Sequence, residues 1–119
     1  MIKILQPIIN DDAVDHRGAI FSYVPGKDIR EICYIFTRAG STRGHHYHKE
    51  FDEYIMLVEG EGIYDCPAQN ERIVIGPGQV IHMPIGCPHT FIPLTDCKSV
   101  SCLTKPWHEC SEPITGYPE

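Results

Sequence analysis

Long hydrophobic runs are missing from this sequence of 119 residues. No uncharged apolar stretch approaches the ~18 residues of a membrane-spanning helix, so we do not expect a membrane protein. The opening residues, MIKILQPIINDD, also lack the long apolar core and the small-residue cleavage site of a signal peptide. We therefore expect a cytoplasmic protein.

Positive charge is scarce as well. Ten lysine and arginine residues face sixteen aspartate and glutamate residues, which gives a formal net charge of −6 at pH 7. Nucleic-acid binding depends largely on basic side chains that displace counterions from phosphates, and no basic stripe opposes this balance. Nucleic acid is therefore not expected as a partner, although a few arginines in one pocket can still bind a small anion.

The Cys-x-x-Cys motif is absent, although the chain contains six cysteines. In a short secreted chain, this number would predict a disulfide framework. Because no export signal is present, free thiols are the better prediction. Cys33, Cys97 and Cys102 lie in apolar, strand-like runs, where cysteine usually packs as a small hydrophobic residue.

A sustained apolar period of 3.6 residues is also missing, so the sequence predicts no helix. Short runs of strand composition recur instead between turn residues such as Pro25-Gly26 and Gly76-Pro77-Gly78. The predicted strands are Ile2–Leu5, Ala19–Val24, Glu31–Thr37, Arg43–His48, Glu53–Glu59, Gly62–Asp65, Arg72–Ile75, Val80–Met83, Thr90–Ile92 and Lys98–Leu103. Many short strands of this kind are typical of an all-β sandwich or barrel.

The length allows one domain over residues 1–119, with the barrel at about 30–104 and a proline-rich tail at 105–119. The tail should be extended, with Trp107 as its anchor. It is either a partly ordered terminus or a segment that closes the barrel mouth or reaches a second subunit. The N-terminal strands and the tail both need partners for their backbone groups, which predicts a homodimer.

Metal-binding side chains gather in residues 40–60, GSTRGHHYHKEFDEYIMLVEG. His46 and His48 are two positions apart on a predicted strand, so both can point to the same face. Glu53 belongs to the next predicted strand and can approach from the side. We therefore expect three ligands from one hairpin.

A fourth ligand is predicted in residues 78–93, GQVIHMPIGCPHTFIP, where a turn at Pro84 and Gly86 precedes His89. Three imidazoles and one carboxylate suit a divalent transition metal, namely Mn, Fe, Co, Ni or Zn. The carboxylate of Glu53 supports this prediction, because a buried carboxylate is costly unless an ion compensates it. The sequence thus predicts one metal ion held by His46, His48, Glu53 and His89.

These two segments resemble the two sequence motifs of the cupin superfamily, G-x5-H-x-H-x4-E-x6-G and G-x5-P-x-G-x2-H. Every ligand position matches over residues 40–93. The one departure is Pro93, where the second motif usually ends in Asn, a residue that is not a ligand in the family. The resemblance implies a single-domain cupin β-barrel, also called a jelly roll or double-stranded β-helix.

Two stretches resemble elements of the dTDP-4-dehydrorhamnose 3,5-epimerases and the dTDP-sugar 3,4-ketoisomerases. They are DHRGAIF at residues 15–21 and RGHHYHK at residues 43–49. In both families a histidine matching His46 removes a proton beside the sugar ketone, and in the ketoisomerases a second histidine matches His48. The resemblance also implies that arginines matching Arg17 or Arg43 lie near the phosphates of the nucleotide sugar.

The chain departs from those enzymes at Glu53, because they work without a metal and generally carry Gln at this position. If His46 binds a metal, it cannot also serve as a free base. The ion would then act as a Lewis acid on a carbonyl while another group moves the proton. The candidates for that catalytic role are Tyr47, Tyr64, His82 and a metal-bound water.

The cupin fold hosts many reactions, so the fold alone does not name one. The favoured prediction is a metal-dependent epimerase or isomerase that acts on a keto-sugar or nucleotide sugar by proton transfer beside a carbonyl. Two alternatives stay open. One is an Fe(II)-dependent dioxygenase that acts on a small organic acid, and the other is a sugar- or anion-binding protein without catalysis.

Overall fold

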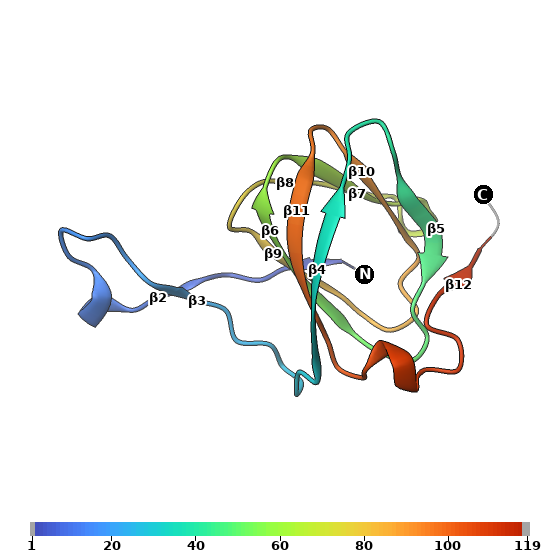
Figure 1. Ribbon diagram of the computed structural model, residues 1–119, viewed down its shortest axis with the longest axis horizontal. Helices are drawn as coiled ribbons and strands as arrows, with labels where there is room; N and C mark the ends of the chain where they lie inside the picture. The colour runs from blue at the N-terminus through green and yellow to red at the C-terminus, as the bar shows by residue number, and fades with distance from the viewer. Residues whose placement is uncertain (1, 118–119) are drawn as a thin grey trace.

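The computed structural model describes residues 2–117, and its regular secondary structure is almost entirely β-strand (Figure 1). Met1, Pro118 and Glu119, which belong to the predicted domain and tail, lie outside the described residues. The strands are β1 (Lys3–Ile4), β2 (Ile8–Ile9), β3 (Phe21–Ser22), β4 (Glu31–Thr37), β5 (Arg43–Tyr47), β6 (Glu53–Glu59), β7 (Gly62–Cys66), β8 (Glu71–Ile75), β9 (Val80–Met83), β10 (His89–Pro93), β11 (Cys97–Leu103) and β12 (Thr115–Gly116). Three short 3-10 turns interrupt them, η1 (Asp11–Ala13), η2 (Pro67–Gln69) and η3 (Trp107–Glu109). No helix in this part of the chain is long and apolar enough to cross a membrane.

Two antiparallel sheets of five strands each form the barrel. The first sheet has the order β1-β9-β6-β11-β4, and the second has the order β12-β5-β10-β7-β8. From β4 to β7 and again from β8 to β11, each successive strand changes sheet. This alternation is the jelly-roll arrangement, so the predicted all-β fold is confirmed.

The predicted strands match the barrel closely, and β4, β6 and β9 begin and end where the sequence placed them. The predicted hairpin between the two histidines and Glu53 is wrong, because β5 and β6 lie in different sheets. The linking residues do not make a tight turn. Phe51 and Asp52 are almost fully buried as the chain crosses from one sheet to the other. The ligands therefore approach from opposite sides of the barrel.

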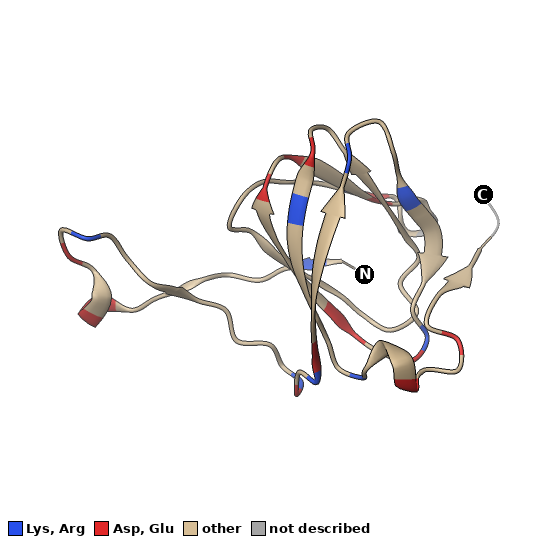
Figure 2. Ribbon diagram, in the orientation of Figure 1, with Lys and Arg blue, Asp and Glu red and all other residues tan. Residues whose placement is uncertain are grey.

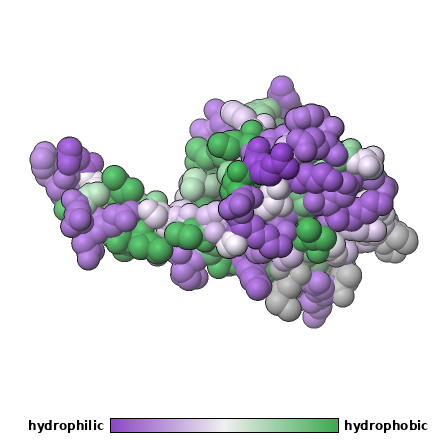
Figure 3. All heavy atoms as spheres, turned by 90° about the horizontal axis from the view of Figure 1, so that it is seen from below, coloured by the Kyte–Doolittle hydropathy of each residue, from purple (hydrophilic) through white to green (hydrophobic). Residues whose placement is uncertain are grey.

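An N-terminal arm, residues 6–24, projects to one side of the barrel (Figure 1). Its strands β2 and β3 pair only with each other, over two residue pairs. The charged residues of the arm lie at its tip (Figure 2), and apolar residues cover much of its middle (Figure 3). Its exposed large hydrophobic residues are Ile8, Ile9, Val14, Ile20, Phe21 and Val24. A two-stranded ribbon of this kind is only marginally stable alone in water, so the arm needs a surface to pack against.

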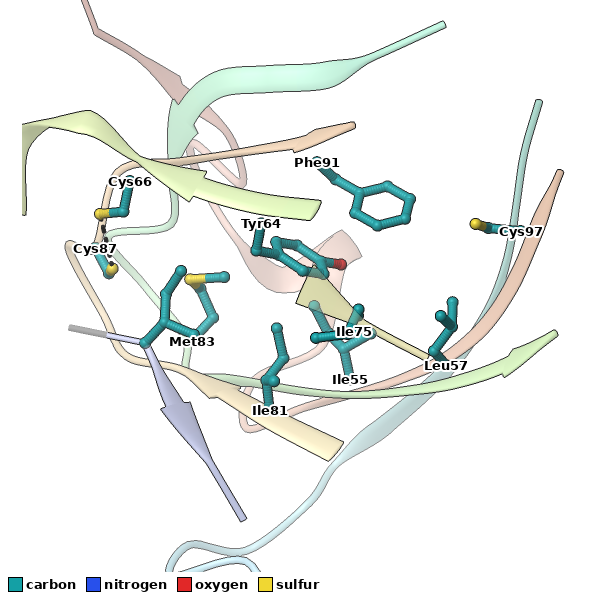
Figure 4. Packing of buried hydrophobic residues seen from close by; sticks show 11 residues of the cluster. Ile55, Leu57, Tyr64, Cys66, Ile75, Ile81, Met83, Cys87, Phe91 and Cys97 are labelled. Carbon is teal, nitrogen blue, oxygen red and sulfur yellow. Dashed lines mark hydrogen bonds between the residues drawn. The ribbon is translucent and has the colours of Figure 1, made fainter. Parts of the chain in front are cut away.

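The hydrophobic core fills the space between the two sheets (Figure 4). Tyr64 and Phe91 pack there with ring centroids 4.7 Å apart, and Tyr64 also approaches the ring of His89 at 6.3 Å. The core therefore continues directly into the predicted metal site. All six cysteines lie within the described residues, and none of them forms a disulfide, as the sequence predicted. Figure 4 shows two of them, Cys66 and Cys87, with their sulfur atoms 3.7 Å apart.

Candidate metal centre

A β-bulge in β5 brings Arg43 onto the same face as His46. Strand alternation alone would turn residues three positions apart to opposite faces. His89 lies opposite His46, and two residues further along β10, Phe91 lies opposite Arg43, so β5 carries one extra residue. The backbone of His45 takes a positive φ of 56° at this point. Bulges commonly redirect side chains near functional sites, and this one turns an arginine toward three histidines.

Gly44 makes the bulge sterically possible. A Cβ atom at this position would lie 2.3 Å from Cγ2 of Thr90 on the neighbouring strand. The Thr90 hydroxyl in turn accepts a hydrogen bond from the backbone N–H of His45 at 3.0 Å. The close approach of β5 and β10 therefore requires glycine here.

His46, His48 and His89 form one compact group. One side-chain nitrogen from each lies within 4.8 Å of those of the other two. The ring centroids are 4.6 Å apart for His46 and His89, and 5.1 Å apart for His46 and His48. Their side chains can therefore meet one ion.

Nδ1 of two of these rings faces a backbone carbonyl. Nδ1 of His48 lies 2.9 Å from the carbonyl oxygen of Pro113, and Nδ1 of His89 lies 2.9 Å from that of Cys87. The backbone of Gly44 also hydrogen-bonds the ring of His46. A carbonyl can only accept, so Nδ1 of His48 and of His89 must carry hydrogen, which leaves Nε2 as the electron-pair donor of the neutral ring. Metal-binding histidines are usually held in this way.

Glu53 approaches His48 from the first sheet, but the structure does not include it in the group of three histidines. Its Oε1 lies 3.3 Å from Nε2 of His48, and its Oε2 accepts a hydrogen bond from Oγ of Ser101 at 2.5 Å. The residue is only 8% exposed. Since Nε2 of a neutral His48 and a carboxylate oxygen are both acceptors, their proximity requires a proton or a metal ion between them.

The pKa values of the three histidines shift in different directions. Burial lowers the pKa of His89 to about 4 and also lowers that of His46. Burial likewise lowers the pKa of His48, but the hydrogen bond and charge of Glu53 outweigh it and raise this pKa above its ordinary value. For Glu53, burial raises the pKa, and the bonds from His48 and Ser101 lower it by more. His46 and His89 are therefore neutral at pH 7, and positive charge is favoured between His48 and Glu53.

A cavity of about 360 Å³ opens over these residues. Six predicted site residues line it, namely Arg43, His46, His48, Glu53, Tyr64 and His89. The sequence reasoning missed the hydroxyl groups of Thr37, Ser99 and Ser101, which also line the cavity. Alternation along β4 and β11 was the available signal, because these positions share the inward face of their strands.

Arg43 is fixed at the edge of this cavity. Its Nε donates to Oγ1 of Thr37 at 2.9 Å, and its Nη2 donates to the carbonyl of Phe36 at 2.8 Å. Both acceptors lie at the end of β4 in the other sheet. The guanidinium thus bridges the two sheets, and its position is set before any ligand binds.

Three predicted site residues do not line the cavity. Tyr47 lies between His46 and His48 on β5, so strand alternation turns its side chain to the other face, and its register partner on β12 is Thr115. The ring of His82 stacks on Tyr54 on the outer face of the first sheet.

In that position His82 Nε2 lies 2.8 Å from Oδ1 of Asp52, which also bonds Lys27. Arg17 lies at the tip of the arm, where its Nη2 is 2.6 Å from Oδ2 of Asp15. Strand alternation was an available signal against Tyr47, which lies between His46 and His48, whereas the positions of His82 and Arg17 depend on pairings between distant residues.

A family comparison agrees with this fold. The sequence model of the cupin domain matches residues 35–103, a segment that contains all four predicted metal ligands. Among curated proteins, no sequence matches this one.

Several solved structures share the fold. The TDP-quinovose 3,4-ketoisomerase of Campylobacter jejuni is 17% identical, with a TM-score of 0.78 over 98% of this chain and 92% of its own. A 3,4-ketoisomerase of Helicobacter canadensis is 19% identical, with a TM-score of 0.74 over 91% and 86% of the two chains. A dTDP-6-deoxy-D-glucose-3,5-epimerase of Legionella pneumophila is 15% identical, with a TM-score of 0.72 over 97% and 71%. Because all three structures are less than 25% identical to this chain, the similarity shows a shared fold.

Proposed function

This chain belongs to the cupin domain family, and from that premise we propose that it is a metal-dependent epimerase or isomerase of a keto-sugar or nucleotide sugar. The observation that carries the metal part is the pair of acceptors formed by His48 and Glu53, 3.3 Å apart and beside two neutral imidazoles. A sugar substrate is supported by the cavity and its hydroxyl groups, and by the ketoisomerase and epimerase structures that share the fold.

The donor set fits a divalent transition metal. His46, His48, His89 and Glu53 would hold the ion, and nitrogen and carboxylate donors of this kind suit Mn, Fe, Co, Ni or Zn. A bound ion would polarise a sugar carbonyl and stabilise the negative charge that forms when a neighbouring carbon loses its proton. The group that removes this proton is then one other than the ligands.

Three side chains were predicted to move a proton, namely Tyr47, Tyr64 and His82. Of these, Tyr64 lines the cavity. Burial, together with the negative charge of Glu53, raises its pKa well above the ordinary value. Its hydroxyl therefore keeps its proton at neutral pH. In an epimerisation or isomerisation, this suits Tyr64 to return a proton or to donate a hydrogen bond, but not to act as the base.

Arg43 is the proposed phosphate contact inside this chain. A planar guanidinium can bind a phosphate through two parallel hydrogen bonds, which a lysine cannot do. A 3,4-ketoisomerase of Thermoanaerobacterium thermosaccharolyticum with the same fold was solved in complex with TDP, which supports a nucleotide sugar as the ligand. The cavity edge then binds the phosphates while the metal centre binds the sugar.

The proposed assembly is a homodimer in which the arm of one copy packs on the other. The edge strand β4 exposes Ile32, Tyr34 and Phe36 on its outer face, at 73%, 65% and 39%. Val100 and Met56 continue this apolar row across β11 and β6. The arm projects away from its own barrel (Figure 1), so a second copy is the surface that its apolar residues fit. Arg17 at the arm tip would then bind substrate held by the partner.

The test combines metal analysis with proton exchange. The purified protein should bind about one transition-metal ion per chain. With candidate keto-sugars in deuterated water, including dTDP-4-keto-6-deoxyglucose, deuterium should enter at the carbon beside the ketone. Exchange without metal would refute only the metal part. Oxygen consumption by the iron form without exchange would favour the dioxygenase, and tight binding without exchange would favour a binding protein.

A further inference from the structure

The C-terminal strap, residues 106–116, lies along the outside of β5 and reaches the metal centre (Figure 1). Its strand β12 pairs with β5, with Thr115 opposite Tyr47 and Gly116 opposite His46. One residue further, the backbone N–H of Tyr117 donates to the carbonyl of His45 at 3.0 Å. The strap therefore runs beside the strand that carries two of the predicted ligands.

Ion pairs from Glu112 of the strap, and from Lys105 just before it, reach the loop between β5 and β6. Glu112 pairs with Lys49, and the backbone N–H of Glu112 donates to Oε2 of Glu50 at 2.7 Å. Nζ of Lys105 bonds the other oxygen of Glu50 at 3.0 Å. These contacts hold the next residue of the strap, Pro113, beside His48.

His48 is enclosed by residues of the strap and the loop. The ring of Phe51 stacks on it, with centroids 4.5 Å apart, and Trp107 meets it edge-on at 6.5 Å. The carbonyl of Pro113 accepts from Nδ1 at 2.9 Å. Two aromatic rings thus limit how the imidazole tilts, while the carbonyl decides which nitrogen carries the hydrogen.

The three histidines differ in where this hydrogen bond comes from. The partner of His89 is Cys87 and that of His46 is Gly44, each two residues away in the chain. The partner of His48 is 65 residues away. Local backbone geometry therefore orients two of the rings, whereas the orientation of the third depends on the docked strap.

We propose that the Pro113 carbonyl is a positioning group for His48, which holds the ring hydrogen on Nδ1 and directs Nε2 to the metal. This inference rests on the proposed metal site. The proline ring fixes its own φ, which limits the movement of the carbonyl. Hydrogen bonds of this type to metal-binding histidines typically change metal affinity by about 10- to 100-fold.

The test weakens this carbonyl without changing any side chain. Cys110 permits chemical ligation of a synthetic peptide, residues 110–119, to a thioester of residues 1–109. In one peptide an ester replaces the amide between Pro113 and Ile114, because an ester carbonyl accepts hydrogen bonds less well. The all-amide ligated chain is the matched control. All seven histidines lie in residues 1–109 and can be labelled with nitrogen-15.

In the metal-free ester protein at alkaline pH, the nitrogen spectrum should show His48 losing its preference for hydrogen on Nδ1. His89 should be unchanged and serves as the internal reference. Zinc affinity should fall by about 10-fold or more. The same His48 tautomer in both proteins would overturn the inference. If neither protein binds zinc, the proposed metal function fails, and the tautomer still decides the role of the strap.

Discussion

The barrel and the N-terminal arm bury their apolar residues in different ways. In the barrel, Leu57 and Ile81 are fully buried by residues of the same chain. In the arm, Ile8 and Phe21 are 53% and 55% exposed, although they are of the same residue types as the core. The barrel therefore buries its core with residues of this chain alone, whereas the apolar residues of the arm have no such cover within the described residues.

The largest expected effect is a loss of metal from the barrel while the arm stays unchanged. His89→Ala removes a buried imidazole whose neighbours are the other predicted ligands, so metal content should fall from about one ion per chain to nearly none. The arm is remote from this change, and the dimer should persist. Elemental analysis and light scattering of the same sample measure both results.

His82→Ala is the matched control for that variant. It also removes a histidine from a barrel strand, but His82 is only partly buried, lies on the outer face and bonds Asp52. Its metal content should equal that of the unchanged protein. Equal metal loss in both variants would show that His89 acts through folding and not as a ligand.

The barrel and its site were largely predictable, because their signals are local. The spacing of His46, His48 and Glu53, and the turn before His89, specify four inward positions through strand alternation. The cupin resemblance supplied the fold that brings them together. The predicted hairpin failed, because spacing in the sequence does not reveal that β5 and β6 belong to different sheets.

Other parts of the site depend on contacts between distant residues. The bulge at Gly44 became visible only through the pairing of β5 with β10, and it decides that Arg43 faces the cavity. The bond from His48 to Pro113 joins residues that no motif connects. The arm was predicted as strand, but Ala19–Val24 shortens to Phe21–Ser22, because β3 has only the two-residue strand β2 to pair with.

The next largest effect is a loss of dimerisation through a change in the arm. Phe21→Asp places a charge on the apolar middle of the arm, where packing against a second copy would bury it without a partner. The dimer should dissociate at micromolar concentration, with metal content unchanged. His16→Asp is the control, since it adds the same charge at the polar tip. Light scattering that gives a dimer for both variants would refute packing through the arm.

The free energy of unfolding of the metal-free protein should depend on pH through the histidines of the barrel. His89 has a pKa of about 4 in the folded protein, against ~6.5 in an unfolded chain. The unfolded state therefore binds more protons between these values, so the free energy of unfolding falls as pH falls through this window, by about 3 kcal/mol from this residue. The raised pKa of His48 has the opposite sign and contributes stability that is lost as pH rises.

Denaturant titrations of the chelator-treated protein and of His89→Gln measure this difference. The variant should lose less stability than the unchanged protein between pH ~6.5 and about 4. Above this window neither state protonates residue 89, so the difference between the two proteins should become constant. Parallel curves throughout the acid range would contradict the low pKa of His89.

The smallest effect concerns the two arginines, one in each region. Arg43→Ala should weaken binding of a nucleoside diphosphate by about 10-fold, the usual cost of a charged hydrogen bond, with metal content intact. Arg43→Lys should recover only part of this loss, because lysine cannot bind a phosphate through two parallel bonds.

Arg17→Ala should give a similar loss only where the arm of one copy reaches the cavity of the other. In the background of Phe21→Asp, which separates the copies, Arg17→Ala should therefore have no further effect, while Arg43→Ala should still weaken binding. Calorimetry on the two single and two double variants measures this, since coupled sites depart from additivity. An Arg17 effect that persists in the separated protein would show that the arm folds back on its own barrel, and the contrast between the two regions would then fail.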